Sequence, residues 1–390
     1  MNLRMRVAIL IQAFGRFGGA ERAALVHYSR FKEAGKDVDL FADFTDKHLW
    51  ARQELNKISF TPLPQSLGEP ESVTLVRDLD EYDRILIHHH VEPLLAFRIV
   101  RSMGKKTAWY SGSIFEPAYS DLLHGDDYRN VSLTFEKTTK SFYGNLLGSL
   151  GLTFFPISKR ILRIIDFQTV ARYGKIISNS EYQARYIKNI YGRDSVVVYP
   201  PVESGLLSAP TVPVEIDSPY AMMVGAFVPY KNFQAGIRTM EPLKGECSLA
   251  IVGSGLLKDE YEQLASKLGI DLHIFYGSND SIMHSLYSGA SFLIHPSLFE
   301  GFGFIPAEAA LHKKATILTT RSGVKELLVD EDSSYLCDPT DVPLMQQRAK
   351  HLSDDPSSAS RMGSRAFDSI HDLSTANQSM AVWEELERWN

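Results

Sequence analysis

Short apolar runs alternate with amphipathic runs of helical period along most of the chain. The apolar runs are typical of buried strands, and apolar residues at every third or fourth position are typical of helices. This alternation predicts parallel sheets with helices on both faces, which is an α/β fold. Strands are predicted at residues 6–14, 37–43, 84–90, 106–111, 175–179, 196–199, 220–227, 247–253, 272–276, 291–295, 315–319 and 334–337.

The alternation stops at residues 200–219, which contain five prolines and few periodic apolar positions. Such a stretch is typical of a linker. We therefore predict two Rossmann-like, doubly wound domains, at residues 1–205 and 206–375. Because ligands of such sheets bind beyond the carboxyl ends of the strands, the two domains are expected to face a cleft.

The composition is that of a globular protein, with 44% hydrophobic residues. No apolar run reaches the roughly 18 residues that span a bilayer. The basic and apolar N-terminus lacks a small-residue cleavage site, so we interpret it as a first strand and not as a signal peptide. Cys247 and Cys337 lie in apolar runs, which indicates buried free thiols and a cytoplasmic location.

Charge is distributed unevenly along the chain. Residues 1–200 carry 27 Lys and Arg against 22 Asp and Glu, whereas residues 201–390 carry 14 against 25. A basic first half indicates an anionic partner, such as a membrane surface or a phosphate-bearing acceptor, and chance variation between domains is the alternative. Residues 142–165 combine apolar and aromatic side chains with flanking lysines and arginines. This pattern is typical of a peripheral segment on the inner face of a membrane, or of a helical excursion packed on the first domain.

The stretch at residues 291–316 contains two carboxylates, Glu300 and Glu308, around the glycines Gly301 and Gly303. An apolar run precedes them and a run of helical period follows, so the pattern predicts a strand, a tight turn and a helix start. Backbone amides at a helix start bind anions, and a carboxylate can accept two protons from a vicinal diol. A site with both properties suits a nucleotide sugar. The alternative is a solvated loop glutamate and a second glutamate favoured by the helix dipole.

The order of several motifs resembles the retaining GT-B glycosyltransferases of family 4, the E-x7-E group that includes bacterial and archaeal mannosyltransferases. The resemblance covers nearly the whole chain. It implies that the second domain binds the donor, that the first domain binds the acceptor, and that a C-terminal helix at residues 376–390 packs back onto the first domain. The motifs are Gly18-Gly19-Ala20-Glu21, Leu162-Arg163 with Asp166, Ile177-Ser178-Asn179-Ser180, Val198-Tyr199-Pro200-Pro201-Val202, Val224-Gly225 with Lys231, Val252-Gly253-Ser254-Gly255, and the stretch from Glu300 to Glu308.

The resemblance also implies roles for individual residues. Lys231 is expected to bind the donor diphosphate, Glu300 the hydroxyls of the donor sugar, and Glu308 the ribose diol. The predicted catalytic residues are Glu300, Lys231 and His90. The predicted donor-binding residues are Gly18, Gly19, Gly225, Lys231, Gly253, Glu300, Gly301, Phe302, Gly303, Phe304 and Glu308.

One position departs from the family pattern in the donor domain. Ala226 stands where relatives of this kind carry an arginine. Another cation is then expected to assist Lys231 in stabilising the diphosphate. The candidates are Arg16, Arg22 and Arg321.

A second departure lies in the first domain. Gly112 stands where relatives often carry a histidine beside the reacting sugar. Three histidines end the preceding predicted strand, and strand alternation places His88 and His90 on one face and His89 on the other. His90, at the carboxyl end, is our hypothesis for the missing group, and ordinary strand-end histidines are the alternative.

These observations predict a retaining transferase of polysaccharide biosynthesis, which moves a hexose from a nucleotide diphosphate sugar to a glycan or lipid-linked acceptor. No metal ion, cofactor or nucleic acid is expected, and the Asp-x-Asp pairs at residues 37–39 and 78–80 are interpreted as solvated aspartates. GDP-mannose is the favoured donor, from the resemblance alone. Two alternatives stay open: a catalytically silent nucleotide-sugar or glycan-binding protein of the same fold, and a GT-B sugar-nucleotide epimerase.

Overall fold

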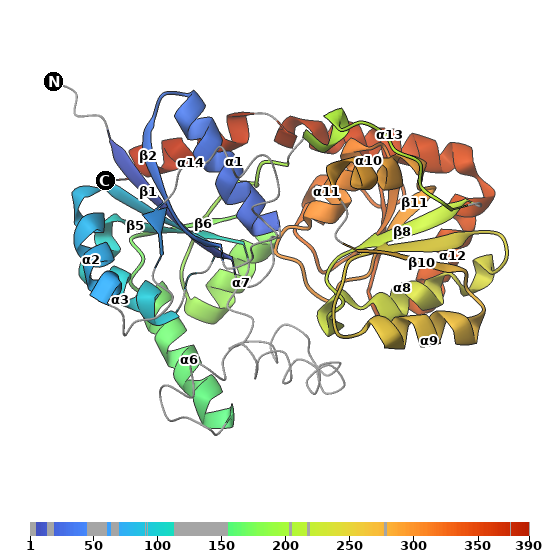
Figure 1. Ribbon diagram of the computed structural model, residues 1–390, viewed down its shortest axis with the longest axis horizontal. Helices are drawn as coiled ribbons and strands as arrows, with labels where there is room; N and C mark the ends of the chain where they lie inside the picture. Colours follow the sequence, from blue (N-terminus) through green and yellow to red (C-terminus); the bar gives the residue numbers. More distant parts are fainter. Residues whose placement is uncertain are drawn as a thin grey trace. The chain divides into compact units, whose positions relative to one another are not determined.

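The computed structural model describes residues 5–13, 19–44, 61–63, 70–89, 91, 93–112, 155–202, 205–216, 219–276, 279–374 and 376–389. The chain forms two compact units. Of the described residues, those up to Gly112, from Phe155 to Pro201 and from Ala376 onward form unit 1, and those from Val202 to Ser374 form unit 2. In each unit, helices cover both faces of a parallel sheet (Figure 1).

Unit 1 is built on a seven-stranded sheet with the order β3-β2-β1-β4-β5-β6-β7. Its strands are β1 (Arg6–Ala13), β2 (Asp37–Phe44), β3 (Thr61–Pro62), β4 (Arg84–His88), β5 (Thr107–Ser111), β6 (Lys175–Ser178) and β7 (Val196–Val197). All neighbouring strands run parallel, and Val7 of β1 pairs with Val38 of β2 and with Arg84 of β4. The strand order reverses between β1 and β4, which is where ligands of doubly wound sheets bind.

The helices of unit 1 include one from the C-terminus of the chain. They are α1 (Gly19–Glu33), α2 (Pro70–Asp78), α3 (Pro93–Met103), α6 (Phe155–Val170), α7 (Glu181–Tyr191) and α14 (Ala376–Glu387). Helix α14 packs against α1 (Figure 1). The ring centroids of Phe31 and Trp383 are 5.0 Å apart. Lys175 Nζ lies 2.6 Å from Glu385 Oε2. The predicted return of the C-terminal helix to the first domain is confirmed.

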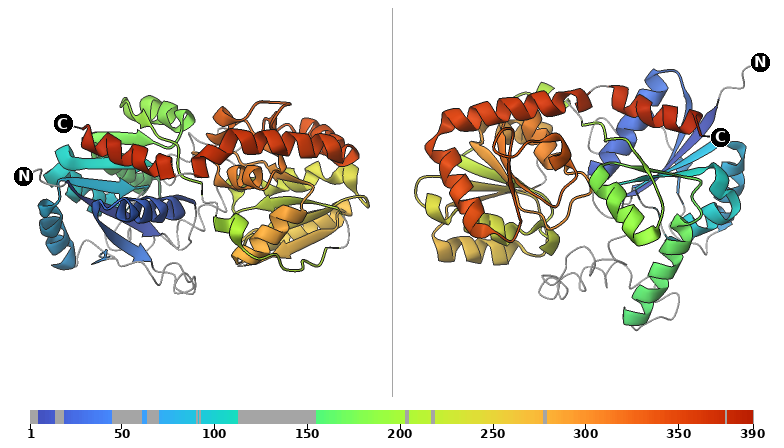
Figure 2. Two further views of the ribbon diagram at one scale, coloured as in Figure 1. Left: turned by 90° about the horizontal axis from the view of Figure 1, so that it is seen from above. Right: turned by 180° about the vertical axis from the view of Figure 1, so that it is seen from behind.

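Unit 2 is built on a six-stranded parallel sheet with the order β10-β9-β8-β11-β12-β13. Its strands are β8 (Tyr220–Val224), β9 (Ser248–Val252), β10 (Leu272–Phe275), β11 (Phe292–His295), β12 (Ala315–Thr319) and β13 (Tyr335–Cys337). Its helices are α8 (Phe233–Thr239), α9 (Lys258–Leu268), α10 (Asp280–Gly289), α11 (Phe304–Leu311), α12 (Val342–Asp354) and α13 (Pro356–Ile370). The two further views in Figure 2 show these helices in layers on either side of the sheet.

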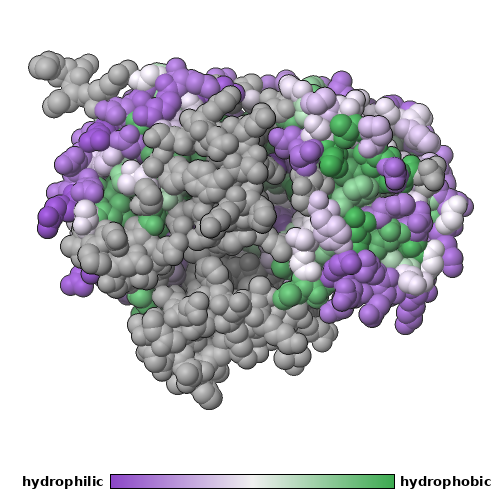
Figure 3. Space-filling model, viewed as in Figure 1, coloured by the Kyte–Doolittle hydropathy of each residue, from purple (hydrophilic) through white to green (hydrophobic). Residues whose placement is uncertain are grey.

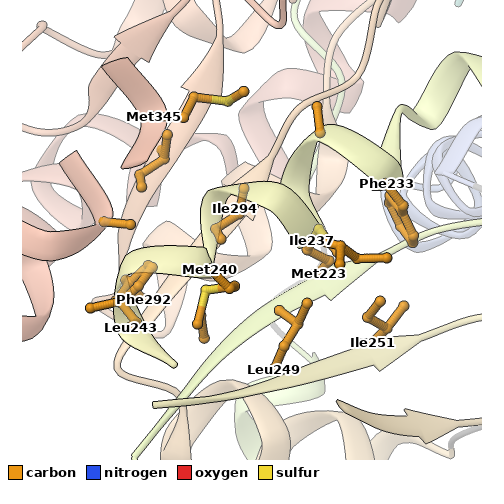
Figure 4. Packing of buried hydrophobic residues seen from close by; sticks show 14 of the residues in the cluster. Met223, Phe233, Ile237, Met240, Leu243, Leu249, Ile251, Phe292, Ile294 and Met345 are labelled. Atoms are coloured by element: carbon orange, nitrogen blue, oxygen red, sulfur yellow. The ribbon is translucent and has the colours of Figure 1, made fainter. Parts of the chain in front are cut away.

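Successive side chains of the unit 2 sheet enter cores on opposite faces, as strand geometry requires. Met223 of β8, Phe233 of α8 and Phe292 of β11 belong to one core (Figure 4). The preceding residue, Met222, belongs to the opposite core with Leu286 of α10. All five side chains are at most 1% exposed, and burying a side chain of this size contributes about 1.5–3 kcal/mol. The continuous apolar runs in the sequence therefore reflect strands that are covered on both faces.

The two cysteines lie in the core of unit 2. Cys247 and Cys337 are both buried and free, as predicted. Burial raises the pKa of each thiol to about 11. Because thiolates are the reactive form, these side chains act as small apolar packing groups.

Few large apolar side chains of the described residues are exposed. Helix α6 presents two of them, Ile164 at 62% and Phe167 at 43% exposure. Residues 142–154 of the predicted membrane segment lie outside the described residues. On the face of unit 2 seen in Figure 3, apolar patches lie between hydrophilic ones. Within the described part of the chain, no helix is both long and apolar enough to cross a membrane.

Candidate functional site

Two glycine loops meet where β8 and β9 of unit 2 end. The backbone φ angles of Gly225 and Gly253 are 152° and 155°, a region that side chains rarely allow. The amide of Gly225 donates to Val252 O at 2.9 Å, and the amide of Phe227 donates to Ser254 O at 2.9 Å. A Cβ atom on Gly253 would lie 1.9 Å from Gly225 O. The two predicted glycines thus let the loops touch backbone to backbone at the carboxyl edge of the sheet.

Lys231 lies in the short 3₁₀ turn that follows the first of these loops, at Pro229–Lys231. The next residue, Asn232, has a φ of 53°, and its side-chain amide donates to Pro296 O at 3.1 Å and to Pro339 O at 2.9 Å. These bonds hold the turn against the loops after β11 and β13. The Lys231 side chain is 13% exposed, and its ammonium donates to Glu300 Oε1. The structure therefore brings together two residues that are 69 positions apart in the sequence.

Glu300 follows β11 and is anchored by its backbone. Its amide donates to Arg321 O at 2.9 Å, and its carbonyl accepts from the amide of Gly323 at 3.2 Å. Three groups converge on Oε1: the Lys231 ammonium, the Ser297 hydroxyl at 3.0 Å, and His295 Nε2 at 3.4 Å. The carboxylate is therefore fixed from β11, from the loop after it, and from the turn after β8.

The charges around Glu300 keep its carboxyl group ionised. Burial by itself raises the pKa of Glu300, but the positive charge of Lys231 and the contact with His295 outweigh it and hold this pKa well below its ordinary value. Burial also lowers the pKa of His295, which is 1% exposed. The imidazole of His295 is accordingly neutral at pH 7.

The second carboxylate oxygen of Glu300 has a different environment. Among the described residues, every hydrogen bond and ion pair of the Glu300 carboxylate goes to Oε1. The side chain keeps 16% of its surface exposed. Oε2 is therefore the oxygen that can accept a hydrogen bond from a ligand hydroxyl.

The turn between Glu300 and α11 is closed by backbone geometry. Gly303 has a φ of 105°, and a Cβ atom there would lie 2.8 Å from Ser322 Oγ. Ser322 Oγ donates to Phe302 O at 2.8 Å, and the amide of Val324 donates to the same oxygen at 2.6 Å. Helix α11 begins at Phe304 without a side-chain cap. Its first amides retain the capacity to bind an anion.

Glu308 lies in the same helix but in another cluster of contacts. It is 7% exposed, and its Oε2 accepts from the Tyr287 hydroxyl of α10 at 2.9 Å. Gly301 and Phe302, which follow Glu300 in the segment that leads to Glu308, are both buried. The structure thus gives the two predicted glutamates separate partners.

The cations proposed to replace the arginine at Ala226 lie in different places. Arg321 precedes Ser322 in unit 2, and its Nη2 lies 3.3 Å from Asp338 Oδ2. Arg22 lies in α1 of unit 1, and Arg16 is outside the described residues. Of the described candidates, Arg321 is therefore the one whose backbone contacts Glu300, because its carbonyl oxygen accepts from the Glu300 amide at 2.9 Å.

The predicted residues of unit 1 are described only in part. Gly19 is the first residue of α1, whereas Gly18 and His90 lie outside the described residues. His89 has a φ of 62°, and a Cβ atom added to Gly112 would lie 2.8 Å from its Nδ1. The ring of His89 therefore occupies the space beside position 112. The prediction for His90 stays a prediction.

Sequence reasoning missed three side chains of the unit 2 site: His295, Ser297 and Tyr287. The first two flank Pro296 directly after a strongly apolar strand, at the position where ligand-facing residues of such sheets occur. That signal was present in the sequence. Tyr287 gave no comparable signal, because its helical position alone indicates core packing.

Known proteins match parts of this chain in sequence. Residues 212–369 match the family model described as Glycosyl transferases group 1, so this part of the chain is a glycosyltransferase group 1 domain. An N-acetylgalactosaminyltransferase that acts on N-acetylgalactosamine-N,N'-diacetylbacillosaminyl-diphospho-undecaprenol, from Campylobacter jejuni, is 27% identical over 36% of this chain and 39% of the relative. The MMP alpha-(1->4)-mannosyltransferase of Mycolicibacterium hassiacum is 31% identical over 32% of each chain. The chain thus spans less than half the length of these curated relatives.

Solved structures match over nearly the full length. Anabaena HepE in complex with UDP-glucose superposes with a TM-score of 0.75 and 16% identity, covering 98% of this chain and 99% of the other. WaaG, a glycosyltransferase involved in lipopolysaccharide biosynthesis, superposes with a TM-score of 0.68 and 14% identity, covering 97% and 99%. The fold is GT-B, as the sequence predicted.

Proposed function

We propose that this GT-B chain is a retaining, metal-independent hexosyltransferase of the family 4 type. In this proposal it transfers a hexose from a nucleotide diphosphate sugar to a glycan or lipid-linked acceptor. The observation that carries the proposal is the cluster of Lys231, Ser297 and His295 around one oxygen of Glu300. It supplies a cation for the diphosphate next to a carboxylate oxygen that can hold a sugar hydroxyl.

Each group of the cluster has a role in the transfer. As the bond from the anomeric carbon to the diphosphate breaks, negative charge grows on the leaving oxygens, where Lys231 and the first amides of α11 stabilise it. The acceptor oxygen bonds to the anomeric carbon on the same face, and its proton passes to the leaving diphosphate. Oε2 of Glu300 holds the donor sugar in place for this step, and Glu308 binds the ribose.

The donor is the least constrained part of the proposal. GDP-mannose is our first choice, supported by the mannosyltransferases among the relatives, such as the O-antigen chain mannosyltransferase RfbU of Salmonella typhimurium at 24% identity over 42% of this chain. HepE was solved with UDP and with UDP-glucose, which makes UDP-sugars the second choice. We propose no resident cofactor.

Unit 1 is the proposed acceptor-binding part. A lipid-linked acceptor would bring the protein to the inner face of the cytoplasmic membrane. The exposed Ile164 and Phe167 of α6, close to Arg160 and Arg163 in the same helix, support such a peripheral contact. Flotation with vesicles that contain anionic lipid tests this; recovery of all protein in the bottom fraction at low salt would contradict it.

Thermal-shift measurements with GDP-, UDP- and ADP-sugars test the donor site, because a ligand of the native state raises the Tm. The proposal expects a rise with one nucleotide class, followed by slow release of its nucleoside diphosphate in the presence or absence of EDTA. Binding without release would favour the catalytically silent protein. Conversion of the donor to an epimer without acceptor would favour the epimerase.

A further inference from the structure

Glu308 is an unusual residue for its position. Helix α11 has the sequence FIPAEAAL, in which Glu308 is the one ionisable side chain, and the residues from Pro306 to Leu311 are all buried. Moving a carboxylate from water into such a setting costs several kcal/mol unless donors compensate. The Tyr287 hydroxyl, 2.9 Å from Oε2, is such a donor, and Tyr287 itself is 1% exposed.

Tyr287 packs against His312, and His312 in turn contacts His284. The Tyr287 ring stacks on His312 with 4.8 Å between centroids and an angle of 24°. His312 Nδ1 lies 2.8 Å from the Glu308 carbonyl oxygen, and its Nε2 lies 3.1 Å from His284 Nδ1. A carbonyl oxygen only accepts, so Nδ1 of His312 carries the proton. Nε2 of the neutral ring then accepts from Nδ1–H of His284.

These contacts join α10 to both the backbone carbonyl and the side-chain carboxylate of Glu308. His284 and Tyr287 lie one turn apart in α10, and they reach the Glu308 carbonyl, through His312, and the Glu308 carboxylate. The position of the carboxylate therefore depends on α10 as well as on the χ angles of the glutamate. A long side chain that is fixed before binding loses less conformational entropy when the ligand arrives.

We infer that Tyr287 is a positioning residue that orients the Glu308 carboxylate toward the ribose hydroxyls of the donor nucleotide, and that it thereby determines the preference for ribonucleotides over 2′-deoxyribonucleotides. The inference rests on the proposed function, in which Glu308 binds the ribose. A phenylalanine at position 287 would fill the same space but would remove the hydroxyl that donates to Oε2 of Glu308. The preference for the ribose hydroxyl would then fall.

The chain offers a matched control in the same core. Tyr220 of β8 is also buried, and its hydroxyl donates to Leu286 O at 2.8 Å, one residue before Tyr287. Tyr220→Phe and Tyr287→Phe each remove one buried hydroxyl and one hydrogen bond, so both should lower the Tm by a similar amount. They differ in that Tyr220 makes no hydrogen bond to Glu308 among the described residues.

The test is calorimetric binding of UDP, GDP and ADP, each beside its 2′-deoxy counterpart, to the full chain. We expect the wild type and Tyr220→Phe to bind the ribonucleotide about tenfold or more tightly than the deoxy form, because a hydrogen bond to a charged group is involved. We expect Tyr287→Phe to reduce this preference to less than about threefold. With the donor sugar, Tyr287→Phe should raise KM and leave kcat close to that of the wild type.

A double variant shows whether Tyr287 acts through Glu308. In the Glu308→Gln background, Tyr287→Phe should change the preference no further, since coupled residues are not additive. This background also removes the buried charge, so the comparison remains possible if Tyr287→Phe alone does not fold.

Four results would overturn the inference. An unchanged preference in Tyr287→Phe, or a further loss in the double variant, would show that Tyr287 does not act through Glu308. A wild type that binds a nucleoside diphosphate without ribose preference would overturn this inference and leave donor binding intact. A wild type that binds none of the three nucleotides would overturn the proposed function as well.

Discussion

The two units differ in the buried polar side chains that lie in or near their sheets. In unit 2, Lys231 and Glu300 form an ion pair in which the two side chains are only 13% and 16% exposed. In unit 1, His27 of α1 and His88 of β4 are at most 1% exposed, and their four ring nitrogens have no hydrogen-bond partner among the described residues. The buried groups of unit 2 are therefore paired charges, and those of unit 1 are neutral rings.

The rings of unit 1 pack as aromatic groups. The centroids of His27 and His88 are 5.4 Å apart, and Tyr110 of β5 stacks on His88 at 4.7 Å. Burial lowers the pKa of His27 to about 3 and lowers that of His88 well below its ordinary value. Unit 2 therefore has a site in which charged groups are already in place for a ligand. In the described part of unit 1, the stability of the core depends instead on the histidines staying neutral.

The largest expected effect comes from removing the charge of Lys231. Lys231→Met should lower turnover about 100-fold to 1,000-fold, because the leaving diphosphate loses its cation. It also leaves Glu300 buried without its ion-pair partner, so the Tm should fall. Steady-state kinetics and thermal unfolding measure both effects.

Lys350→Met is the matched control for this variant. Lys350 also contacts two carboxylates, Glu246 at 2.9 Å and Asp354 at 2.8 Å, but its side chain is 40% exposed. Exposed pairs contribute about 0–1 kcal/mol, so turnover and Tm should stay close to the wild-type values. Equal losses in the two variants would mean that burial of the pair has no special consequence.

The contact between the glycine loops gives the next largest effect. Gly253→Ala places a methyl group 1.9 Å from Gly225 O, where only a backbone shift can relieve the clash. We expect the free energy of unfolding to fall by about 3 kcal/mol, measured by urea denaturation.

Gly245 provides the comparison, with a φ of 77° but no atom within 4 Å of an added Cβ. Gly245→Ala should cost about 1 kcal/mol, from the backbone angle alone. If Gly253→Ala lowers the free energy of unfolding no more than Gly245→Ala does, the two loops do not approach each other as closely as described.

A smaller effect should appear in the stability of unit 1, which should depend on pH. The pKa of His27 in the folded state lies below that of the unfolded chain, so acid favours the unfolded state. The contribution of neutral His27 to the free energy of unfolding is fully present above about pH 6.5 and is lost as pH falls below that value. At pH 5 the loss from this residue should be about 2 kcal/mol. Urea denaturation at pH 7 and pH 5 measures the loss.

His27→Phe should reduce the acid sensitivity, because the ring volume remains and the titrating group is gone. His371→Phe is the control, since His371 is exposed and its Nδ1 lies 3.0 Å from Asp368 O. An unchanged pH dependence in His27→Phe would show that His27 is not the group that responds.

The sequence was informative wherever structure follows from periodicity. The run at residues 220–227 contains β8, and the run at residues 315–319 became β12, because strands covered on both faces are continuously apolar. The two-residue strand β3 was not predicted, since Thr61–Pro62 is too short to show any period.

The site was predictable only as a set of residue types. The motifs indicated that Lys231, Glu300 and Glu308 belong together in one domain, but not which contacts they make. The convergence of Ser297 and His295 on Oε1 depends on the loop after β11, and the contact of Tyr287 with Glu308 depends on how α10 packs against α11. Neither loop geometry nor helix packing leaves a regular pattern in a single sequence.

Calorimetric titration of GDP, UDP and ADP into the wild type and into Lys231→Met tests whether unit 2 holds a cation and a carboxylate in place for a nucleotide diphosphate. We expect the wild type to bind at least one of the three nucleotides, and Lys231→Met to bind the same nucleotide about tenfold or more weakly. Equal affinity in the two proteins, or no binding by the wild type, would contradict this expectation.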